Sequence, residues 1–356
     1  MLNKLAWNKL GVILFIALLA SIGIYSNNTQ ADSSNSDRSA AKDTYLDKVK
    51  KRGYLICGVA GELPGFSFVD AKGKYIGLDV DICRAVSSAL FDDPTKVQFR
   101  NLNSDERFDA LRSGKIDLLS RNTTNTLSRD TENNLEFAPT VFYDSQRIMV
   151  DRNRGIESLE DLEGKSICVV SNTTSYDNLE DYMNKRKISY QVVSKQDANS
   201  LFDAYEHNEC EAITGDSSLL ITSRIMLANP DEHQILAETI AQEPLAPAVL
   251  DRDSQWSDVV KWITFALIQA EELGINSVNL SSQKASKDSQ VRRFLGLDKN
   301  LGSQMGLTDD FTKRIIKHVG NYQEIYDRNL TKPFGFKREE NALWRDGGLM
   351  YSPPFN

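Results

Sequence analysis

Apolar and polar positions alternate along the chain in a pattern that predicts strands followed by helices. Short apolar runs at 54–59 and 116–119 are typical of buried strands. The residues between these runs predict helices at 79–91 and at about 108–111, the second ending before Gly114. The longer helix carries its apolar side chains on one stripe, at Val80, Cys83, Val86 and Leu90.

The same alternation occurs again after the loop at 161–165. Strands are predicted at 166–170, 190–193 and 211–214, and helices at about 175–185 and 201–207. Apolar strands that alternate with helices indicate parallel sheets covered by helices. Two such units in tandem predict an α/β protein with two lobes, each a mainly parallel sheet flanked by helices, and with a cleft between them.

The N-terminal pattern predicts export. Lys4 and Lys9 precede an apolar stretch at 10–25, and a polar segment rich in Asn and Ser follows it. We interpret 1–31 as a signal peptide and 32–44 as a flexible linker. The apolar stretch is about 16 residues long, shorter than the roughly 20 that a spanning helix needs. We therefore expect an exported, periplasmic protein, with a membrane tether through an uncleaved segment as the alternative.

Size and charge narrow the classes of function. The chain has 356 residues, of which 40% are hydrophobic, and this is enough for about two domains. Its net charge of −8 and its lack of a basic stripe argue against a nucleic-acid partner, because binding phosphates needs a concentrated basic face. We expect a monomer that holds no cofactor and no metal.

The four cysteines predict disulfides if the chain is exported, because oxidising compartments favour pairing. They contain no Cys-x-x-Cys spacing, which argues against a metal site. Of the three possible connectivities, Cys57 with Cys83 and Cys168 with Cys210 is preferred, since each pair then lies within one structural unit. Four buried thiols are the alternative.

A polar stretch directly follows the strand predicted at 116–119. Residues 120–134 have the sequence SRNTTNTLSRDTENN. Side chains such as Asn122 and Thr124 would lie at the carboxyl end of that strand, where ligands bind in open α/β sheets. Arg129 is close enough to offer a planar fork of donors to a carboxylate.

The second unit carries a matching polar turn at 171–175, with the sequence SNTTS. Its hydroxyls and free backbone N–H groups suit an anion, although ordinary helix capping is the favoured interpretation of this turn alone. Asp216 follows the strand predicted at 211–214 and offers a carboxylate to an ammonium group, and a loop or capping role is its alternative. Together these features predict a receptor for a zwitterion.

Several motifs make the chain resemble a known family. GLDVDICRAVSSAL at 77–90, TLSR at 126–129 and the LEGK loop at 162–165 leading to Thr173 and Thr174 are similar to the family 3 periplasmic solute-binding proteins of ABC amino acid importers. The resemblance covers about 45 to the C-terminus. The tail sequences VGNYQEIYDRNL and NALWRDGGLMYSPPFN resemble the general L-amino-acid-binding branch.

The resemblance implies a role for individual residues. Arg129 matches the arginine that clamps the α-carboxylate of the ligand, and Asp216 matches the acid that holds its α-amino group. Phe66 resembles an aromatic residue at the cleft wall, and a core position is its alternative. The remaining implied ligand contacts are Asn122, Thr124, Thr173 and Thr174.

Two departures from the family pattern concern specificity. Leu63 and Ser104 stand where narrower relatives often carry larger walls, so we expect a wide side-chain subsite and broad selectivity. Asn172 stands where the family usually has glycine, and Asn tolerates left-handed backbone better than most residues.

The resemblance also implies a division of the chain. Lobe 1 would comprise 45–148 and a returning segment at 242–280, and lobe 2 would comprise 149–241. Two crossing strands near 145–151 and 237–244 would form a hinge that closes on the ligand. The segment 281–356 would be an extension that packs on lobe 1.

Three functions compete at this point. The preferred one is a transport receptor that binds an L-amino acid and delivers it to an ABC permease in the inner membrane. An enzyme on the same fold is the first alternative, although the sequence has no GxSxG motif, and His207, His233 and His318 are isolated. Glu62 is the one candidate acid or base, with a solvated loop position as its alternative. A ligand sensor that docks to a receptor is the second alternative.

Overall fold

The structure is a computed structural model that describes residues 43–356. The predicted signal peptide at 1–31 and all but the last two residues of the predicted linker at 32–44 lie outside this range. Within the described range, no helix combines the length and the apolar composition needed to span a bilayer.

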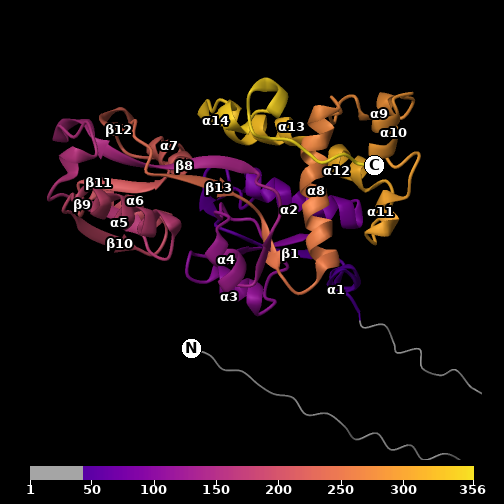
Figure 1. Cartoon of the computed structure of the whole chain (residues 1–356), viewed down its shortest axis with the longest axis horizontal. Helices are drawn as coiled ribbons and strands as arrows, with labels where there is room; N and C mark the ends of the chain where they lie inside the picture. The colour runs from indigo at the N-terminus through magenta and orange to yellow at the C-terminus, as the bar shows by residue number, and fades with distance from the viewer. Residues whose placement is uncertain (1–42) are drawn as a thin grey trace, which may run out of the picture. The chain divides into compact units, whose positions relative to one another are not determined.

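The first lobe is built on a five-stranded sheet, which we use to define lobe 1 (Figure 1). Its strand order is β5 (Val97–Asn101), β1 (Leu55–Val59), β6 (Leu118–Leu119), β14 (Ala248–Leu250) and β7 (Leu135–Phe137). Strand β1 runs parallel to β5 and β6, whereas β14 runs antiparallel to β6 and β7. The helices α1 (Tyr45–Arg52), α2 (Leu78–Phe91), α3 (Arg107–Arg112), α4 (Leu127–Glu132) and α8 (Ser254–Glu272) belong to this lobe.

Both faces of the lobe 1 sheet are buried. Leu55, Cys57 and Val59 face the core that includes α2 and α8, whereas Ile56 faces a second core with Leu111 of α3. This side-chain alternation, with apolar residues on both faces, is why the strand sequence is continuously apolar. A three-stranded antiparallel sheet, β2 (Glu62–Leu63), β3 (Ser67–Val69) and β4 (Tyr75–Ile76), leads into α2.

The backbone geometry at this junction explains why Gly77, the first residue of the GLDVD motif, is a glycine. Its φ is 131°, and a Cβ built on it would lie 2.0 Å from the backbone oxygen of Phe66. Only glycine lets the chain pass this close to the β2–β3 turn as α2 begins.

The second lobe is built on a six-stranded sheet, which defines lobe 2. Its order is β10 (Gln191–Lys195), β9 (Ser166–Val170), β11 (Ala212–Asp216), β8 (Phe142–Asp151) and β12 (His233–Ile235), with β13 (Ala241–Leu245) also paired to β8. Helix α5 (Thr174–Arg186) packs on one face of this sheet and α6 (Ala198–Glu206) on the other, and α7 (Ser217–Arg224) follows β11.

The prediction of mainly parallel sheets needs one correction, because both sheets are mixed. In lobe 2, β9 runs parallel to β10 and β11, but β8 runs antiparallel to β11, β12 and β13. The antiparallel strands arise because the chain crosses between the lobes and returns. Strands β8 and β13 make this crossing side by side, paired from Gln146 with Ala241 to Phe142 with Leu245 (Figure 1).

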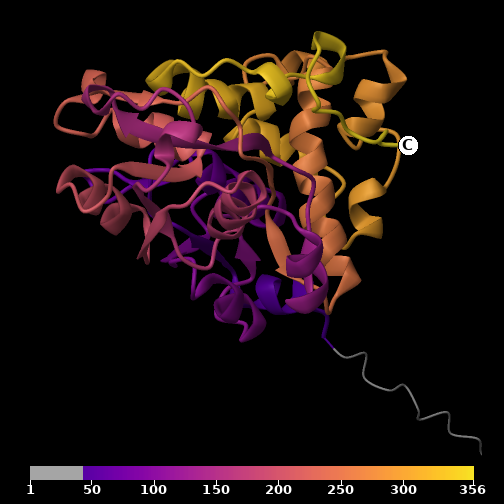
Figure 2. The same ribbon diagram turned by 60° about the vertical axis from the view of Figure 1, so that its left-hand side comes forward.

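The C-terminal segment after α8 is helical and packs on lobe 1. It contains α9 (Leu280–Gln283), α10 (Ser289–Phe294), α11 (Leu301–Gln304), α12 (Phe311–His318), α13 (Tyr322–Tyr326) and α14 (Lys332–Phe334). Ile315, Tyr322 and Tyr326 belong to the same core as Val86 of α2 and Ile263 of α8. Figure 2 shows these helices gathered around α8 from a second direction.

Each lobe contains one disulfide, which joins two neighbouring segments. Cys57 of β1 is bonded to Cys83 of α2, and Cys168 of β9 is bonded to Cys210, which precedes β11. This is the connectivity that the sequence favoured. Each bond joins a strand that lies between two parallel neighbours to a segment next to it.

Candidate ligand-binding site

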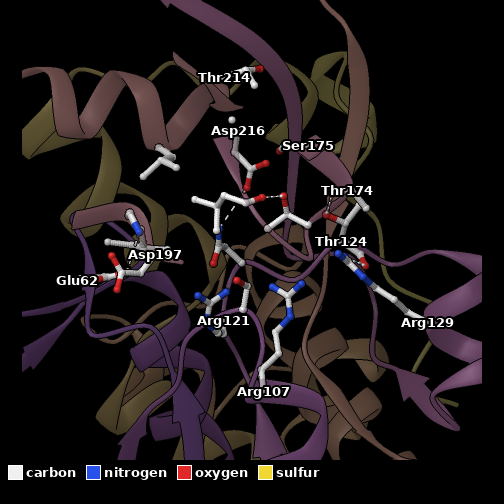
Figure 3. A pocket seen from close by; sticks show the side chains of 18 residues that line it. Glu62, Arg107, Arg121, Thr124, Arg129, Thr174, Ser175, Asp197, Thr214 and Asp216 are labelled. Carbon is white, nitrogen blue, oxygen red and sulfur yellow. Dashed lines mark hydrogen bonds between the residues drawn. The ribbon is translucent and has the colours of Figure 1, made fainter. Parts of the chain in front are cut away.

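Residues at or after the carboxyl ends of the parallel strands of both lobes line one cavity (Figure 3). In each sheet the second strand of the order, β1 or β9, lies between two parallel neighbours, and ligands bind at this edge of open α/β sheets. Lobe 1 lines the cavity with Glu62, Leu63, Ser104, Arg107, Arg121, Asn122, Thr124 and Arg129. Lobe 2 lines it with Val170, Thr173, Thr174, Ser175, Asp197, Ala198, Thr214, Gly215, Asp216 and Leu219.

The structure brings six of the seven residues implied as ligand contacts to this cavity. They are Asn122, Thr124, Arg129, Thr173, Thr174 and Asp216. Phe66 is the exception, and its assignment to the cleft wall is corrected. Only 2% of its surface is exposed, and its ring lies edge-on to Phe142 in the core of lobe 1, with 5.1 Å between the centroids. An apolar ring gains more from this core than from a polar cleft, and Leu63 lines the cavity instead.

Asp79 organises the polar stretch after β6. Ser120 donates its hydroxyl to Oδ1 of Asp79 over 3.1 Å, and the backbone N–H of Asn122 donates to Oδ2 over 2.9 Å. Burial raises the pKa of Asp79 to about 6, and these two hydrogen bonds oppose the rise. Part of the polar stretch therefore supports the loop, and the side chains of Asn122 and Thr124 are left for the cavity.

Arg129 is buried and fixed at the cavity wall. One terminal nitrogen, Nη1, donates to the backbone oxygen of Thr124 over 2.8 Å, and the guanidinium carbon lies 5.6 Å from the ring centroid of Phe108. Burial lowers the pKa of Arg129, and the negative charges of Glu243 and Asp216 oppose this effect. The guanidinium is thus oriented before any ligand arrives.

The turn at 171–175 both caps a helix and lines the cavity. Thr173 is the N-cap of α5, and its hydroxyl accepts from the backbone N–H of Tyr176 over 3.3 Å. Asn172 has a φ of 54°, which is the left-handed conformation. Asn tolerates this conformation better than most residues, as the sequence analysis noted for this position. The first N–H groups of α5 lack partners within the helix, so this end of the helix favours negative charge.

Asp216 ends β11 directly before α7, but its side chain does not cap that helix. Its Oδ2 instead accepts from Nδ2 of Asn122 in lobe 1 over 3.2 Å. Burial raises the pKa of Asp216 well above its usual range, and the nearby carboxyl groups of Asp144 and Glu243 raise it further. This buried group of acids would gain from a cationic partner.

Sequence reasoning missed Glu243, which lies on the crossing strand β13. Its side chain is 1% exposed and accepts from the hydroxyl of Thr124 in lobe 1. It also accepts from the hydroxyl of Thr174 over 2.9 Å and from Nδ2 of Asn178 over 2.8 Å, both in lobe 2. Glu243 therefore links the two lobes beside the cavity, and no local pattern in the sequence distinguishes it from other strand acids.

Two further arginines were also missed. Arg107 is the first residue of α3, and Arg121 follows β6 within the polar stretch itself. Both line the cavity, and burial lowers the pKa of each. Arg107 resembled an ordinary residue of an amphipathic helix, so its sequence context carried no signal. Figure 3 shows both guanidiniums entering the cavity from the lobe 1 side, with Asp216 opposite.

Hydrogen bonds between the lobes surround the cavity, so this is a closed arrangement. Ser104 donates to the backbone oxygen of Ser171 over 3.0 Å, and Nδ2 of Asn172 donates to Asp105 over 2.6 Å. Glu62 is partly buried, and no histidine lines the cavity beside it. Its carboxylate accepts from the backbone N–H of Ala198 over 3.1 Å, and burial raises its pKa.

The residues that line this cavity include no histidine and no group of metal-ligating side chains. Residues 43–356 contain no group of His, Cys, Asp and Glu side chains arranged to hold a metal ion. None of the histidines lines the cavity. The ring of His233 contacts the hydroxyl of Tyr205 over 2.9 Å, and His318 contacts Asp92 over 2.8 Å.

Sequence comparison identifies the family. Residues 55–332 match the bacterial extracellular solute-binding proteins, family 3, and the chain belongs to this family. It is 46% identical over 320 residues to the general L-amino acid-binding periplasmic protein AapJ of Rhizobium johnstonii. This match covers 89% of this chain and 94% of AapJ. It is 42% identical over 319 residues to the glutamate/glutamine/aspartate/asparagine-binding protein BztA of Rhodobacter capsulatus. This match covers 89% of this chain and 94% of BztA.

Solved structures agree with this assignment. An ABC transporter / periplasmic binding protein from Brucella ovis with glutathione bound has a TM-score of 0.86 and 44% sequence identity, and the match covers 88% of this chain and 100% of that one. The family resemblance and the α/β fold of a two-lobe periplasmic binding protein are confirmed, with the correction that the sheets are mixed. The chain is a family 3 solute-binding protein.

Proposed function

We propose that this chain captures L-amino acids with broad specificity by closing its cleft and delivers them to an ABC permease in the inner membrane. One observation carries the proposal. A fixed guanidinium, Arg129, and a buried carboxylate, Asp216, line the same cavity between the lobes. These are complementary to the carboxylate and ammonium groups that every free amino acid has. The names of the relatives AapJ and BztA, both amino-acid-binding proteins, support this choice.

In this proposal Arg129 binds the α-carboxylate and Asp216 binds the α-ammonium group. The first turn of α5 supports the carboxylate with hydroxyls and N–H groups at Thr173 and Thr174. Asn122 and Thr124 complete the contacts from lobe 1. Charge-assisted hydrogen bonds are each worth roughly 1.5–3 kcal/mol, and they are equally available to every L-amino acid.

The charges of the site also explain why closure should need a ligand. Closing an empty cleft buries Arg129 and Asp216 without direct ion-pair partners among the described residues, and burying unpaired charge is costly. A bound zwitterion supplies both countercharges at once. Its differential affinity for the closed state is then what drives closure about β8 and β13, and a permease reads the closed form.

Breadth is the finer part of the proposal. Leu63 and Ser104 line the cavity, and neither is bulky and aromatic. The backbone groups of the ligand are held tightly, whereas the side chain meets a mixed wall, which favours many ligands of graded affinity. We further propose a monomer that acts in the periplasm, with a tether through an uncleaved N-terminal segment as a variant of the same function.

Two other functions stay in competition. An enzyme on this fold would convert its ligand, and a sensor would dock to a receptor instead of a permease. Incubation with amino acids separates the first, since a binding protein returns them unchanged. Pull-down with the permease, with and without ligand, separates the second.

A thermal-shift screen tests the core of the proposal. Purified protein is melted with each L-amino acid, the matching D-isomers and the N-acetylated L-forms. Binding to the native state adds RT ln(1 + [L]/Kd), about 2.7 kcal/mol at a hundredfold excess over Kd. Polar and apolar L-amino acids should stabilise, and competition should show one shared site. Stabilisation by one L-amino acid alone would reject breadth, and equal stabilisation by N-acetylated forms would reject the zwitterion clamp.

A further inference from the structure

The crossing strand β8 changes from one lobe to the other between two neighbouring residues. Phe142 lies in the core of lobe 1, whereas Ile148 lies in a core of lobe 2. The carboxylate of Asp144 accepts from the backbone N–H of Ser218 on α7 over 3.3 Å, which ties Asp144 to lobe 2. Tyr143, directly before it, is held instead by the C-terminal segment that packs on lobe 1 (Figure 1). Bending between the lobes is therefore expected close to these two residues.

Asn341 of the C-terminal segment holds both backbone polar groups of Tyr143 with its side chain. Its Oδ1 accepts from the backbone N–H of Tyr143 over 2.7 Å, and its Nδ2 donates to the backbone oxygen of Tyr143 over 3.0 Å. On β13 the residue opposite Tyr143 is Pro244, which has no N–H to donate. The side-chain amide of Asn341 therefore takes the place of a neighbouring strand, and it satisfies backbone groups that β13 does not pair.

Buried contacts fix Asn341 to the body of lobe 1. Asn341 is 4% exposed, and its backbone oxygen accepts from Nε of Arg338 over 2.8 Å. Nη2 of Arg338 donates to both carboxylate oxygens of Glu271 on α8, each over 3.2 Å. The guanidinium carbon of Arg338 lies 5.1 Å from the ring centroid of Tyr322 and 4.9 Å from that of Tyr326. The amide that holds Tyr143 is thus itself held in one orientation.

The same segment also contacts the two residues before Tyr143. The hydroxyl of Tyr322 donates to the backbone oxygen of Val141 over 2.6 Å. The ring of Phe142 lies 6.3 Å from that of Phe336, measured between centroids. Three successive residues at the lobe 1 end of β8 are therefore held by the C-terminal segment. We call these contacts of Tyr322, Phe336 and Asn341 with 141–143 the hinge brace.

A braced strand end should make closure easier. Ordering the backbone of a residue opposes closure through lost conformational entropy, and the brace removes that freedom before any ligand binds. A larger part of the interaction energy between ligand and cleft then appears as affinity. The effect does not depend on the ligand, because neither Asn341 nor Tyr143 lines the cavity.

We propose that Asn341 is a positioning residue for cleft closure, which raises the affinity for every ligand by bracing the hinge at Tyr143. The C-terminal segment then takes part in binding without touching the ligand. This inference rests on the proposed function, and it adds to it a role for a segment outside the cleft.

Calorimetric titration of Asn341→Ala tests the brace. L-Glutamate, L-glutamine and L-leucine are titrated into the wild-type protein and into the variant, at a temperature where circular dichroism shows both to be folded. The affinity for each ligand that binds should fall by a similar factor of roughly fivefold to thirtyfold, the factor that corresponds to ordering the backbone of one residue. The order of preference among the ligands should stay unchanged.

Hydrogen exchange of the free protein, followed by mass spectrometry, reports on the brace without any ligand. Peptides that cover 141–147 should exchange faster in Asn341→Ala, because the N–H of Tyr143 loses its acceptor. Peptides that cover β9 in lobe 2 should exchange as in the wild-type protein. A contact that only stabilises lobe 1 would change exchange and melting but would leave affinity unchanged.

Two further variants complete the set. Asn300→Ala is the matched control, since Asn300 is an exposed amide of the same segment whose side chain caps no helix. It should leave both affinity and exchange at 141–147 unchanged. Tyr322→Phe keeps the ring and removes only the hydrogen bond to Val141, so it should produce a smaller loss that is again equal across ligands.

The outcomes separate the brace from the proposed function. Unchanged affinity in Asn341→Ala, or a loss confined to one ligand, would overturn the brace and leave the zwitterion clamp standing. A wild-type protein that binds none of the amino acids would overturn both. If Asn341→Ala does not fold, Tyr322→Phe decides the matter, because an equal loss across ligands supports the brace and unchanged affinity rejects it.

Discussion

Asn122 of lobe 1 and Asp216 of lobe 2 meet across the cleft, where Nδ2 of Asn122 donates to Oδ2 of Asp216 over 3.2 Å. Asn122 has a φ of 31°, and its N–H is held by Asp79. Asp216 stands at the end of β11 and leaves the adjoining helix uncapped. Two loops from different sheets are thus shaped so that their polar side chains face one shared cavity.

Replacing Arg129 should weaken every ligand to a similar degree. Arg129→Ala leaves the α-carboxylate buried without its partner, which should cost on the order of 2–5 kcal/mol, or roughly thirtyfold to several-thousandfold in affinity. Arg129→Lys keeps the charge but loses the planar fork, so affinity should fall by less. Calorimetric titration with several L-amino acids measures both.

The control for Arg129 is Lys115→Ala, which removes an exposed cation of lobe 1 outside the cavity. Affinity should not change in this control. Asp216→Asn should weaken all ligands to a similar degree, because it removes the charged partner of the α-ammonium group. Unchanged affinity in Arg129→Ala, or a loss limited to one ligand, would show that the zwitterion is held elsewhere.

Replacing Glu243 should hinder closure for all ligands alike. Glu243→Gln presents an amide to the hydroxyls of Thr124 and Thr174 and to Asn178, so part of the acceptor set that joins the lobes is lost. Affinity should fall about tenfold to a hundredfold, since bonds to charged acceptors are worth about 1.5–3 kcal/mol. Small-angle scattering at saturating ligand should also show less compaction than in the wild-type protein.

Gln242→Ala is the matched control, because Gln242 is exposed on the same strand. It should leave affinity and compaction unchanged. If Glu243→Gln compacts and binds like the wild-type protein, the hydrogen bonds to Glu243 do not contribute to closure.

The two disulfides should be present in the exported protein and should stabilise it. Intact mass should rise by four hydrogens on reduction, and peptide mapping should link Cys57 to Cys83 and Cys168 to Cys210. The sequence separations of 26 and 42 residues correspond to about 3–4 kcal/mol for each bond in the chain-entropy description. Free thiols in the native protein, or unchanged unfolding after reduction, would contradict this.

Asp79 should make stability depend on pH in a defined window. Burial raises its pKa to about 6, above the usual value of about 3.9, so the native state holds the proton more strongly than the unfolded state. Its contribution to the free energy of unfolding is therefore full below about pH 4 and is lost as the pH rises through 6. The free energy of unfolding of the wild-type protein minus that of Asp79→Asn should fall by on the order of 2–3 kcal/mol across this window.

Glu163→Gln provides a control of opposite sign. Hydrogen bonds from Ser189 lower the pKa of this exposed carboxyl, so the wild-type advantage should grow as the pH rises. Denaturant unfolding at several pH values measures both differences. A difference between wild type and Asp79→Asn that stays flat from pH 4 to 6 would exclude a buried, proton-binding Asp79.

Local patterns were sufficient for much of the fold. The strand predicted at 166–170 is β9, and the helix predicted at 79–91 is α2, which begins one residue earlier. Burial of a stripe or of a short run is encoded by neighbours in the chain, so periodicity reveals it. The strand predicted at 116–119 is shorter, Leu118–Leu119, because pairing with β1 and not apolarity sets its length.

The sequence by itself also predicted the two residues that the proposed function uses for a zwitterion. Asp216 ends a strand, Arg129 lies in the helix that follows another strand, and ligands bind at that edge of such sheets. Only the tertiary structure decided the rest. It moved Phe66 into the core, made both sheets mixed through the crossing strands, and brought Glu243 to the cleft. It also left Arg107 and Arg121 buried without ion pairs. The reason is physical, because burial and pairing depend on which distant segments meet, and no single segment carries that information.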